Sequence, residues 1–70
     1  MDRQTVVSSN ISSIGYEPET KTLEIEFTSG GVYQYSDVPP DVFEEIISAS
    51  SHGVYFHQNI KGQYNFEKVG

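Results

Sequence analysis

The stretch Ser29-Gly30-Gly31-Val32-Tyr33-Gln34-Tyr35-Ser36-Asp37-Val38-Pro39-Pro40 contains a turn, a strand and the start of a helix. Its two glycines suit the backbone of a tight hairpin, and the alternation after them is typical of a strand. Pro39 and Pro40 end the strand, because proline cannot donate to a ladder but fits the first turn of a helix. The stretch therefore predicts an α+β fold. It leaves open whether Tyr33 and Tyr35 belong to the core or form a stacking platform for a ligand.

Two more strands are predicted upstream of this turn. One begins at Leu23 and reads Leu-Glu-Ile-Glu-Phe, an alternation typical of a strand with one wet face. The other contains Ile14 and Tyr16, and the polar segment between the two strands includes a proline whose fixed φ suits a turn. A four-residue loop over 18–21 pairs Tyr16 with Leu23 and Ile14 with Ile25, so that all four side chains share one face.

The length of the second turn decides where Tyr33 and Tyr35 point. A two-residue loop at Ser29-Gly30 would turn both tyrosines toward water, beside the glutamates of the preceding strand. A three-residue loop at 29–31 pairs Tyr33 with Phe27 and turns both tyrosines toward the apolar face. Three-residue loops commonly end in a left-handed residue, which glycine supplies. We favour this register because it also keeps the polar side chains of both strands on the other face.

The complete prediction is a small α+β domain over residues 1–70. Its sheet is a three-stranded antiparallel meander over about 11–16, 22–28 and 32–36. A helix over about 40–51 packs on this sheet through one apolar stripe at helical spacing: Val42, Phe43, Ile46, Ile47 and Ser50. A short helix over about 53–60, capped by Ser51, follows. Residues 63–66 then form a short C-terminal strand or an extended tail.

The composition limits the class of protein. Seventy residues allow one domain of thin stability, and 36% hydrophobic residues leave little spare apolar surface. The sequence has no cysteine, which excludes disulfides and cysteine-based metal sites and suits a reducing cytoplasm. The N-terminal residues contain no signal-peptide core and no apolar run approaches a membrane span, so we expect a cytoplasmic protein without a membrane segment.

The net charge of −6 is distributed unevenly along the chain. Residues 1–50 hold nine acidic residues against Arg3 and Lys21, a net charge of −7. Residues 51–70 hold two lysines against one glutamate, a net charge of +1, together with both histidines. Proteins that bind duplex nucleic acid usually carry a basic patch. Most of this molecule would repel phosphate, and only its last twenty residues could approach it.

No residue pattern predicts catalysis or a metal site. Ser51 adjoins His52, but neighbours in sequence rarely present side chains to each other, and a nucleophile also needs an orienting group. His52 and His57 lie on different faces of a helix, and no cysteine joins them. Glu24 and Glu26 could act as an acid/base pair only in a cleft, so we interpret them as solubilising charges. We therefore expect no enzyme activity, no metal and no cofactor.

Short motifs follow one another along nearly the whole chain. They are Ser8-Ser9-Asn10-Ile11, Ile14-Gly15-Tyr16, the strand from Leu23, the segment Gly30 to Tyr35, Val38-Pro39, Ser51 to Phe56, and Ile60 to Tyr64. Together they resemble the KTSC domain, a family named for the C-terminus of some lysyl-tRNA synthetases, over residues 7–69. The resemblance implies a small α+β fold, found alone in bacterial or phage-type proteins or appended to the synthetase, and brings no catalytic residues. RNA binding is suggested for the family by that context alone.

Two kinds of function remain. The first is a non-enzymatic binding module that contacts a protein partner or forms a homodimer through a sheet edge, because the surface is acidic and a short meander has an open edge. The alternative is binding of RNA or single-stranded nucleic acid through residues 52–66, which the net charge of −6 disfavours. The candidate surface consists of His52, Tyr55, His57, Asn59, Lys61 and Tyr64. Tyr33 and Tyr35 are the alternative platform.

Overall fold

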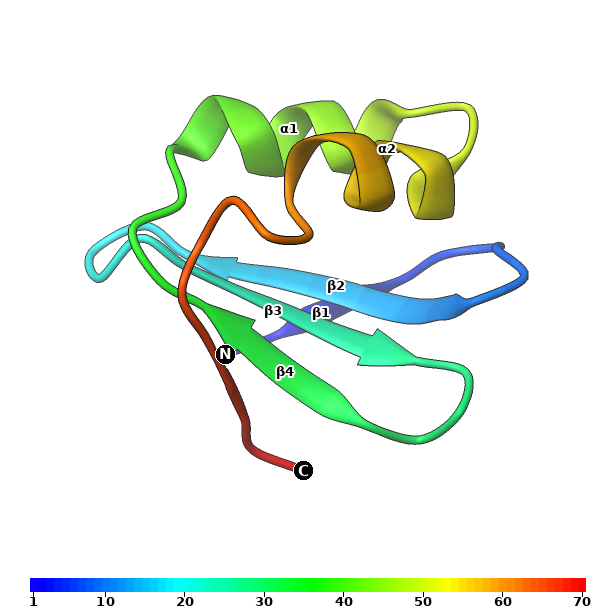
Figure 1. Cartoon of the computed structure of the whole chain (residues 1–70), viewed down its shortest axis with the longest axis horizontal. Coiled ribbons are helices and arrows are strands. Elements are labelled where there is room, and N and C mark those ends of the chain that lie inside the picture. Colours follow the sequence, from blue (N-terminus) through cyan, green and yellow to red (C-terminus); the bar gives the residue numbers. More distant parts are fainter.

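Residues 1–70 form a two-layer α+β structure in the computed structural model, with a sheet on one side and two helices on the other (Figure 1). The helices are α1 (Pro40–Ser48) and α2 (His52–Asn59). The five strands form one antiparallel sheet in chain order: β1 (Arg3–Thr5), β2 (Ile11–Glu17), β3 (Thr22–Phe27), β4 (Val32–Tyr35) and β5 (Phe66–Lys68). Both helices cover the same face, and the other face carries no helix (Figure 1). Neither helix is long and apolar enough to cross a membrane.

The first hairpin has the predicted register. Tyr16 lies opposite Leu23 and Ile14 opposite Ile25, with the loop 18–21 between the strands. Ile14, Leu23 and Ile25 are fully buried on the helix-covered face. The alternation of apolar and polar residues was therefore sufficient to align these two strands.

The second hairpin has the predicted facing but a different register. Its loop is Thr28–Gly30, one residue earlier than expected, and Tyr33 lies opposite Ile25 instead of Phe27. Gly30, with φ +107°, is the left-handed residue that ends the loop. Because the pairing moves by two residues, the side chains keep their faces, and both tyrosines still point toward the helices.

The predicted three-stranded meander is present as β2, β3 and β4, but the prediction missed two edge strands. β1 is a wholly exposed segment without an apolar alternation, so its sequence carries no strand pattern. β5 begins at Phe66, whereas the strand or tail was expected over 63–66, because a turn containing Gly62 at φ +78° occupies the chain before it. Strands of three residues are too short for periodicity to define.

The helix boundaries also differ from the prediction. α1 ends at Ser48, not near 51, and the Ser48 hydroxyl donates to the Glu44 carbonyl oxygen at 2.6 Å. Ala49 is already extended, so Ser50 lies outside the helix, is exposed and does not belong to the apolar stripe. α2 begins one residue early, at His52, and the predicted cap is confirmed, because the Ser51 hydroxyl accepts a hydrogen bond from the Val54 N–H at 3.3 Å.

The core lies between the helices and the covered face of the sheet. Nine buried apolar residues form one cluster: Ile11, Ile14, Leu23, Ile25, Tyr35, Val38, Ile46, Phe56 and Ile60. Aromatic pairs extend it at both ends. Tyr16 stacks on Phe43 of α1 at 5.2 Å, and Phe56 of α2 meets the Phe27 and Tyr35 rings edge to face at 5.3 and 5.6 Å. The aromatic rings therefore fix both helices on the sheet.

An arginine and a glycine hold the edge strand β1 close to its neighbour β2. Arg3 lies opposite Gly15, and a Cβ on Gly15 would come within 2.7 Å of the Asp2 carbonyl oxygen and 2.9 Å of the Arg3 Cγ. The missing side chain at Gly15 therefore allows the start of β1 to approach closely enough for the Arg3 guanidinium to reach across the sheet.

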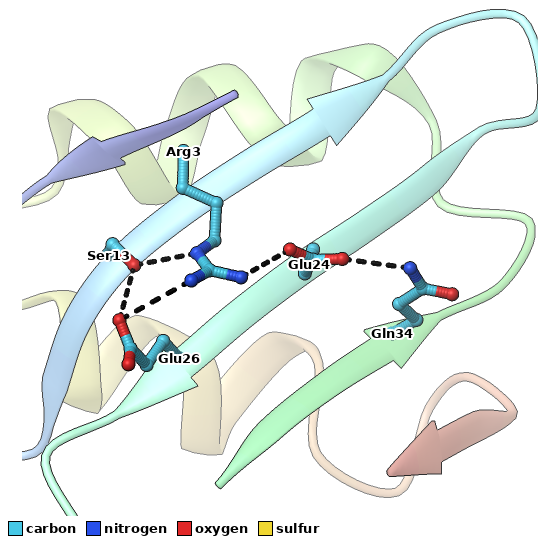
Figure 2. A network of polar contacts seen from close by, with 5 residues as sticks. All are labelled: Arg3, Ser13, Glu24, Glu26 and Gln34. Carbon is cyan, nitrogen blue, oxygen red and sulfur yellow. Dashed lines mark hydrogen bonds and ion pairs between the residues drawn. The ribbon is translucent and has the colours of Figure 1, made fainter. Parts of the chain in front are cut away.

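Arg3 is the centre of a polar network on the uncovered face (Figure 2). Its guanidinium donates to Glu24 and to the Ser13 hydroxyl, and lies 3.6 Å from the Glu26 carboxylate. The Gln34 amide donates to the other Glu24 oxygen at 2.8 Å. Glu24 is only 8% exposed, so its interpretation as a solubilising charge was wrong. The hydrogen bond from Gln34, followed by the contact with Arg3, lowers the pKa of Glu24 below its usual value.

The variant Glu24→Gln tests how much this network stabilises the fold. At pH 7 it should lower the free energy of unfolding by about 1–3 kcal/mol, because Arg3 loses a charged partner in a buried setting. A carboxyl group whose pKa is lower in the native state than in the unfolded chain stabilises the fold fully at pH values above its unfolded pKa of about 4.3. This stabilisation is lost as the pH falls through the native pKa. The cost of the substitution should therefore shrink toward pH 3, as measured by urea unfolding at both pH values.

Glu44→Gln is the matched control, because Glu44 is exposed and its carboxylate forms no hydrogen bond or ion pair. It should change the unfolding free energy little at either pH. An equal cost of Glu24→Gln at pH 7 and pH 3 would contradict the role assigned to the Glu24 carboxylate.

Candidate ligand-binding cleft

A cleft of about 390 Å³ opens between the sheet and the second helix. Its lining comes from the end of β3, from β4, from α2 and the turn after it, and from β5. Five aromatic side chains line it: Phe27, Tyr33, Tyr35, Phe56 and Phe66. We call this site the aromatic cleft. A concave, mostly apolar site with a few polar groups is the usual form of a binding pocket.

The rings of the aromatic cleft contact one another. Phe66 lies 5.9 Å from Tyr33 and 5.8 Å from Tyr35, measured between ring centroids, and Tyr33 meets Phe27 edge to face at 5.6 Å. Phe66 is nevertheless 61% exposed. A large apolar side chain that is both held by neighbours and open to solvent is suited to contact a ligand.

The two strand tyrosines have different roles. Tyr35 is 5% exposed and belongs to the core, in agreement with the interpretation that the three-residue loop favoured. Its burial, with a smaller effect of Tyr33, raises the pKa of Tyr35 to about 12, so the phenol stays neutral at physiological pH. Tyr33 is half-buried and forms part of the wall of the aromatic cleft. The tyrosines are thus neither wholly core nor an open platform.

Positively charged and titratable groups surround the aromatic cleft. His57 and Lys61 line it, and Lys68 lies opposite Tyr33 on the same face of the sheet. The ion pairs of this protein all involve Arg3, so neither lysine is neutralised by a carboxylate. The aromatic cleft is therefore locally positive in a molecule whose net charge is −6.

Two residues of the candidate surface fasten α2 to α1, and a third forms a hydrogen bond within α2. The His52 Nδ1–H donates to the Ile46 carbonyl oxygen at 2.6 Å, and the Tyr55 hydroxyl donates to the Glu45 carboxylate at 2.6 Å. Burial, together with the bond to Glu45, raises the pKa of Tyr55 to about 12. The Asn59 side-chain amide donates to the Tyr55 carbonyl oxygen at 3.2 Å. These contacts give the three residues structural roles outside the aromatic cleft.

The remaining candidates divide between two hollows. Tyr64 lines a separate polar hollow of about 300 Å³ beside Ser36 and Asp37. His57 and Lys61 instead join Tyr33 and Tyr35 in the aromatic cleft. The fold therefore combines parts of two surfaces that the sequence presented as alternatives.

No pattern in the sequence indicated that Phe27, Phe56 and Phe66 would line the same cleft. Phe27 and Phe56 look like ordinary core residues in an alternating strand and a short helix. Phe66 lies in a strand of three residues, and its neighbour in the sheet is β4, some thirty positions earlier in the chain. The one feature of the sequence that pointed to Phe66 as a cleft residue was its position between Lys61 and Lys68, in a segment with few other charges.

Known proteins resemble this chain along most of its length. A family model described as the KTSC domain matches residues 7–64. An uncharacterised protein from Stutzerimonas stutzeri is 44% identical over 64 residues, which cover 91% of this chain and 90% of that protein. A lysine–tRNA ligase from a Nostoc species is 49% identical over 59 residues, which cover 84% of this chain and 10% of the ligase. The chain thus spans about a tenth of the length of the ligases that it matches.

The fold is shared with a solved structure. The crystal structure of a KTSC domain protein from Yersinia pestis superposes with a TM-score of 0.96 at 45% sequence identity, covering 99% of this chain and 97% of that one. The match of the family model, the identity to the relatives and the common fold agree with the resemblance that the sequence motifs indicated. This chain therefore belongs to the KTSC domain family.

Proposed function

We propose that this protein is a non-enzymatic binding module that contacts a protein partner through the aromatic cleft. The observation that supports the proposal is the cleft itself, in which the exposed Phe66 lies beside the half-buried Tyr33. Interfaces are enriched in aromatic side chains that fill or line such depressions. A partner that inserts one apolar side chain into the cleft would bury Phe66. The polar residues around the cleft, which include Asn10, His57 and Lys61, would then fix the orientation of the partner.

The charges favour a partner with acidic groups near that apolar side chain. Lys61 and Lys68 lie at or beside the aromatic cleft without carboxylate partners. The rest of the surface, with a net charge of −7 over residues 1–50, repels other anionic surfaces. This contrast would restrict contact with an acidic segment to one place on the molecule.

The polar groups of the aromatic cleft support a binding role over a catalytic one. The hydrogen bonds of the structure include none between a serine or threonine hydroxyl and a histidine, the pair that activates a nucleophile. Tyr35 is buried and has a pKa of about 12, which is unsuitable for general acid–base catalysis near neutral pH. His57 is exposed and packs its ring against Phe56 at 5.6 Å.

A random peptide library displayed on phage and selected on the folded protein tests this proposal. Selected sequences should combine an aromatic or aliphatic residue with acidic residues. A synthetic peptide from the selection should bind Phe66→Ser about tenfold to a hundredfold more weakly, because the exposed ring is the centre of the contact. Amide shifts in NMR spectra should map to β4, β5 and the end of α2.

Val54→Ser is the control for lost apolar surface. Val54 is 53% exposed on α2 and does not line the aromatic cleft. The selected peptide should bind this variant as it binds the unaltered protein. Selection without enrichment, or equal binding to Phe66→Ser, would contradict the proposal.

Single-stranded RNA is a second candidate ligand of the same cleft. Exposed aromatic side chains stack on bases, and lysines contact the phosphates. Two observations favour it: relatives that match most of this chain are named lysine–tRNA ligases, and Lys61 and His57 lie beside the aromatic side chains. The acidic remainder of the surface opposes it, so the contact would be confined to residues near the cleft.

Titration with single-stranded RNA oligomers at low salt, followed by amide shifts, tests the second candidate. Shifts should gather at the aromatic cleft, and binding should weaken as salt is added. Lys61→Glu should weaken it further, and Phe66→Ser should cost about 1–3 kcal/mol if a base stacks there. Lys21→Glu is the matched control, because it makes the same charge change in the loop between β2 and β3, outside the cleft. The absence of shifts at low salt would exclude this candidate.

A further inference from the structure

We infer that the partner segment binds by strand addition, pairing its backbone with the free edge of β5 beside the aromatic cleft. The inference rests on the proposed function, because it describes how a protein segment would occupy that site. In the observed sheet, β5 pairs with β4 on one side only. An extended peptide can add to such an edge through main-chain hydrogen bonds, while alternate side chains give specificity.

The backbone of β5 has groups directed toward this free side. Toward β4, the Asn65 carbonyl oxygen accepts from the Ser36 N–H at 2.9 Å, and the Val69 N–H donates to the Val32 carbonyl oxygen at 2.8 Å. In an antiparallel ladder the residues that bond a given neighbour alternate along the strand. The N–H and C=O groups of Phe66 and Lys68 therefore point away from β4, where an added strand would meet them.

The other edge of the sheet is less suitable. β1 consists of exposed polar residues, and its Arg3 is already bonded to Glu24, Glu26 and Ser13 on the uncovered face. No apolar cleft borders β1, whereas the side chain of Phe66 is at once part of the β5 edge and a wall of the aromatic cleft. Only at β5 would backbone pairing and apolar burial occur together.

The side chains of β5 specify the chemistry of the partner segment. Phe66 and Lys68 lie on the helix-covered face, opposite Tyr35 and Tyr33, and Glu67 lies on the uncovered face. A complementary strand places an apolar residue opposite Phe66, a basic residue opposite Glu67 and an acidic residue opposite Lys68. If the added strand is antiparallel to β5, the residue opposite Lys68 comes first in its sequence. The partner segment then reads Glu-Lys-Leu, or a similar acidic-basic-apolar triplet, from its N-terminus.

A second copy of this chain cannot present that pattern to the free edge of β5. Its own Glu67-Lys68-Val69 is an acidic-basic-apolar triplet, but the backbone groups of Glu67 and Val69 face β4 within the sheet, and the Val69 N–H already donates to the Val32 carbonyl oxygen. Antiparallel pairing of two β5 strands centred on Glu67 brings the two Glu67 carboxylates together, and parallel pairing in register opposes like charges at both Glu67 and Lys68. Short charged edges are a common means of preventing such self-association. The charges therefore favour a different protein as the partner over the homodimer.

Four synthetic peptides test this inference, each with blocked termini and threonine or valine flanks. One contains Glu-Lys-Leu, one the charge-swapped Lys-Glu-Leu, and one Glu-Lys-Leu with N-methyl groups on the edge-facing amides. The last is N-methylated only on amides that face away from β5. The first should bind about threefold to tenfold more tightly than the charge-swapped peptide, and methylation of the edge-facing amides should weaken it about fivefold or more. Methylation on the outer side should be tolerated.

The double variant Glu67→Lys with Lys68→Glu provides the reciprocal test. Both side chains are exposed, so the fold should persist, and the variant should prefer the charge-swapped peptide. Binding of Glu-Lys-Leu should also protect the Phe66 and Lys68 amides from hydrogen exchange. An unchanged preference, tolerance of edge-facing methylation, or no binding of the first peptide would each overturn strand addition. The proposed function fails separately, when library selection yields no peptide that depends on Phe66.

Discussion

The pairing of β4 with β3 determines which side chains face the helices and which face the uncovered side of the sheet. Side chains alternate between the two faces of a strand, so a shift of one residue would exchange the faces of the whole of β4. The observed pairing places Tyr35 beneath Phe56 of α2 and Gln34 against Glu24 on the opposite face. The helix-covered core and the polar network of the uncovered face are therefore consequences of the same register.

The two faces of the sheet use their charges differently. On the uncovered face the carboxylate of Glu24 is buried among partners, and Arg3 connects β1 to β3 (Figure 2). On the covered face Lys61 and Lys68 remain unpaired near exposed aromatic surface. The first arrangement satisfies its polar groups within the chain and stabilises the sheet. The second leaves charge and apolar area exposed together, which is the combination on which the proposed partner contact depends.

The aromatic cleft is built largely from residues of the core and from residues packed against it. Its floor is the same aromatic layer that fixes α2 on the sheet, so the domain needs few residues beyond its core to form it. The one added element is β5, which supplies Phe66 and leaves an unpaired edge next to it. Members of the KTSC family that match most of this chain include a small protein and a part of lysine–tRNA ligases.

The sequence by its local patterns predicted the α+β class, the register of the first hairpin and the Ser51 cap, because each depends on neighbouring residues. It favoured the inward facing of Tyr33 and Tyr35 but left the alternative open, because that facing depends on the length of one loop. Alternation, proline and glycine positions and capping act over a few residues. Three features depend on long-range packing: the two edge strands, the burial of Glu24, and the meeting of His57, Lys61 and Phe66 with Tyr33. These features join residues distant in the chain, and strands of three residues gain their order from the neighbour with which they pair.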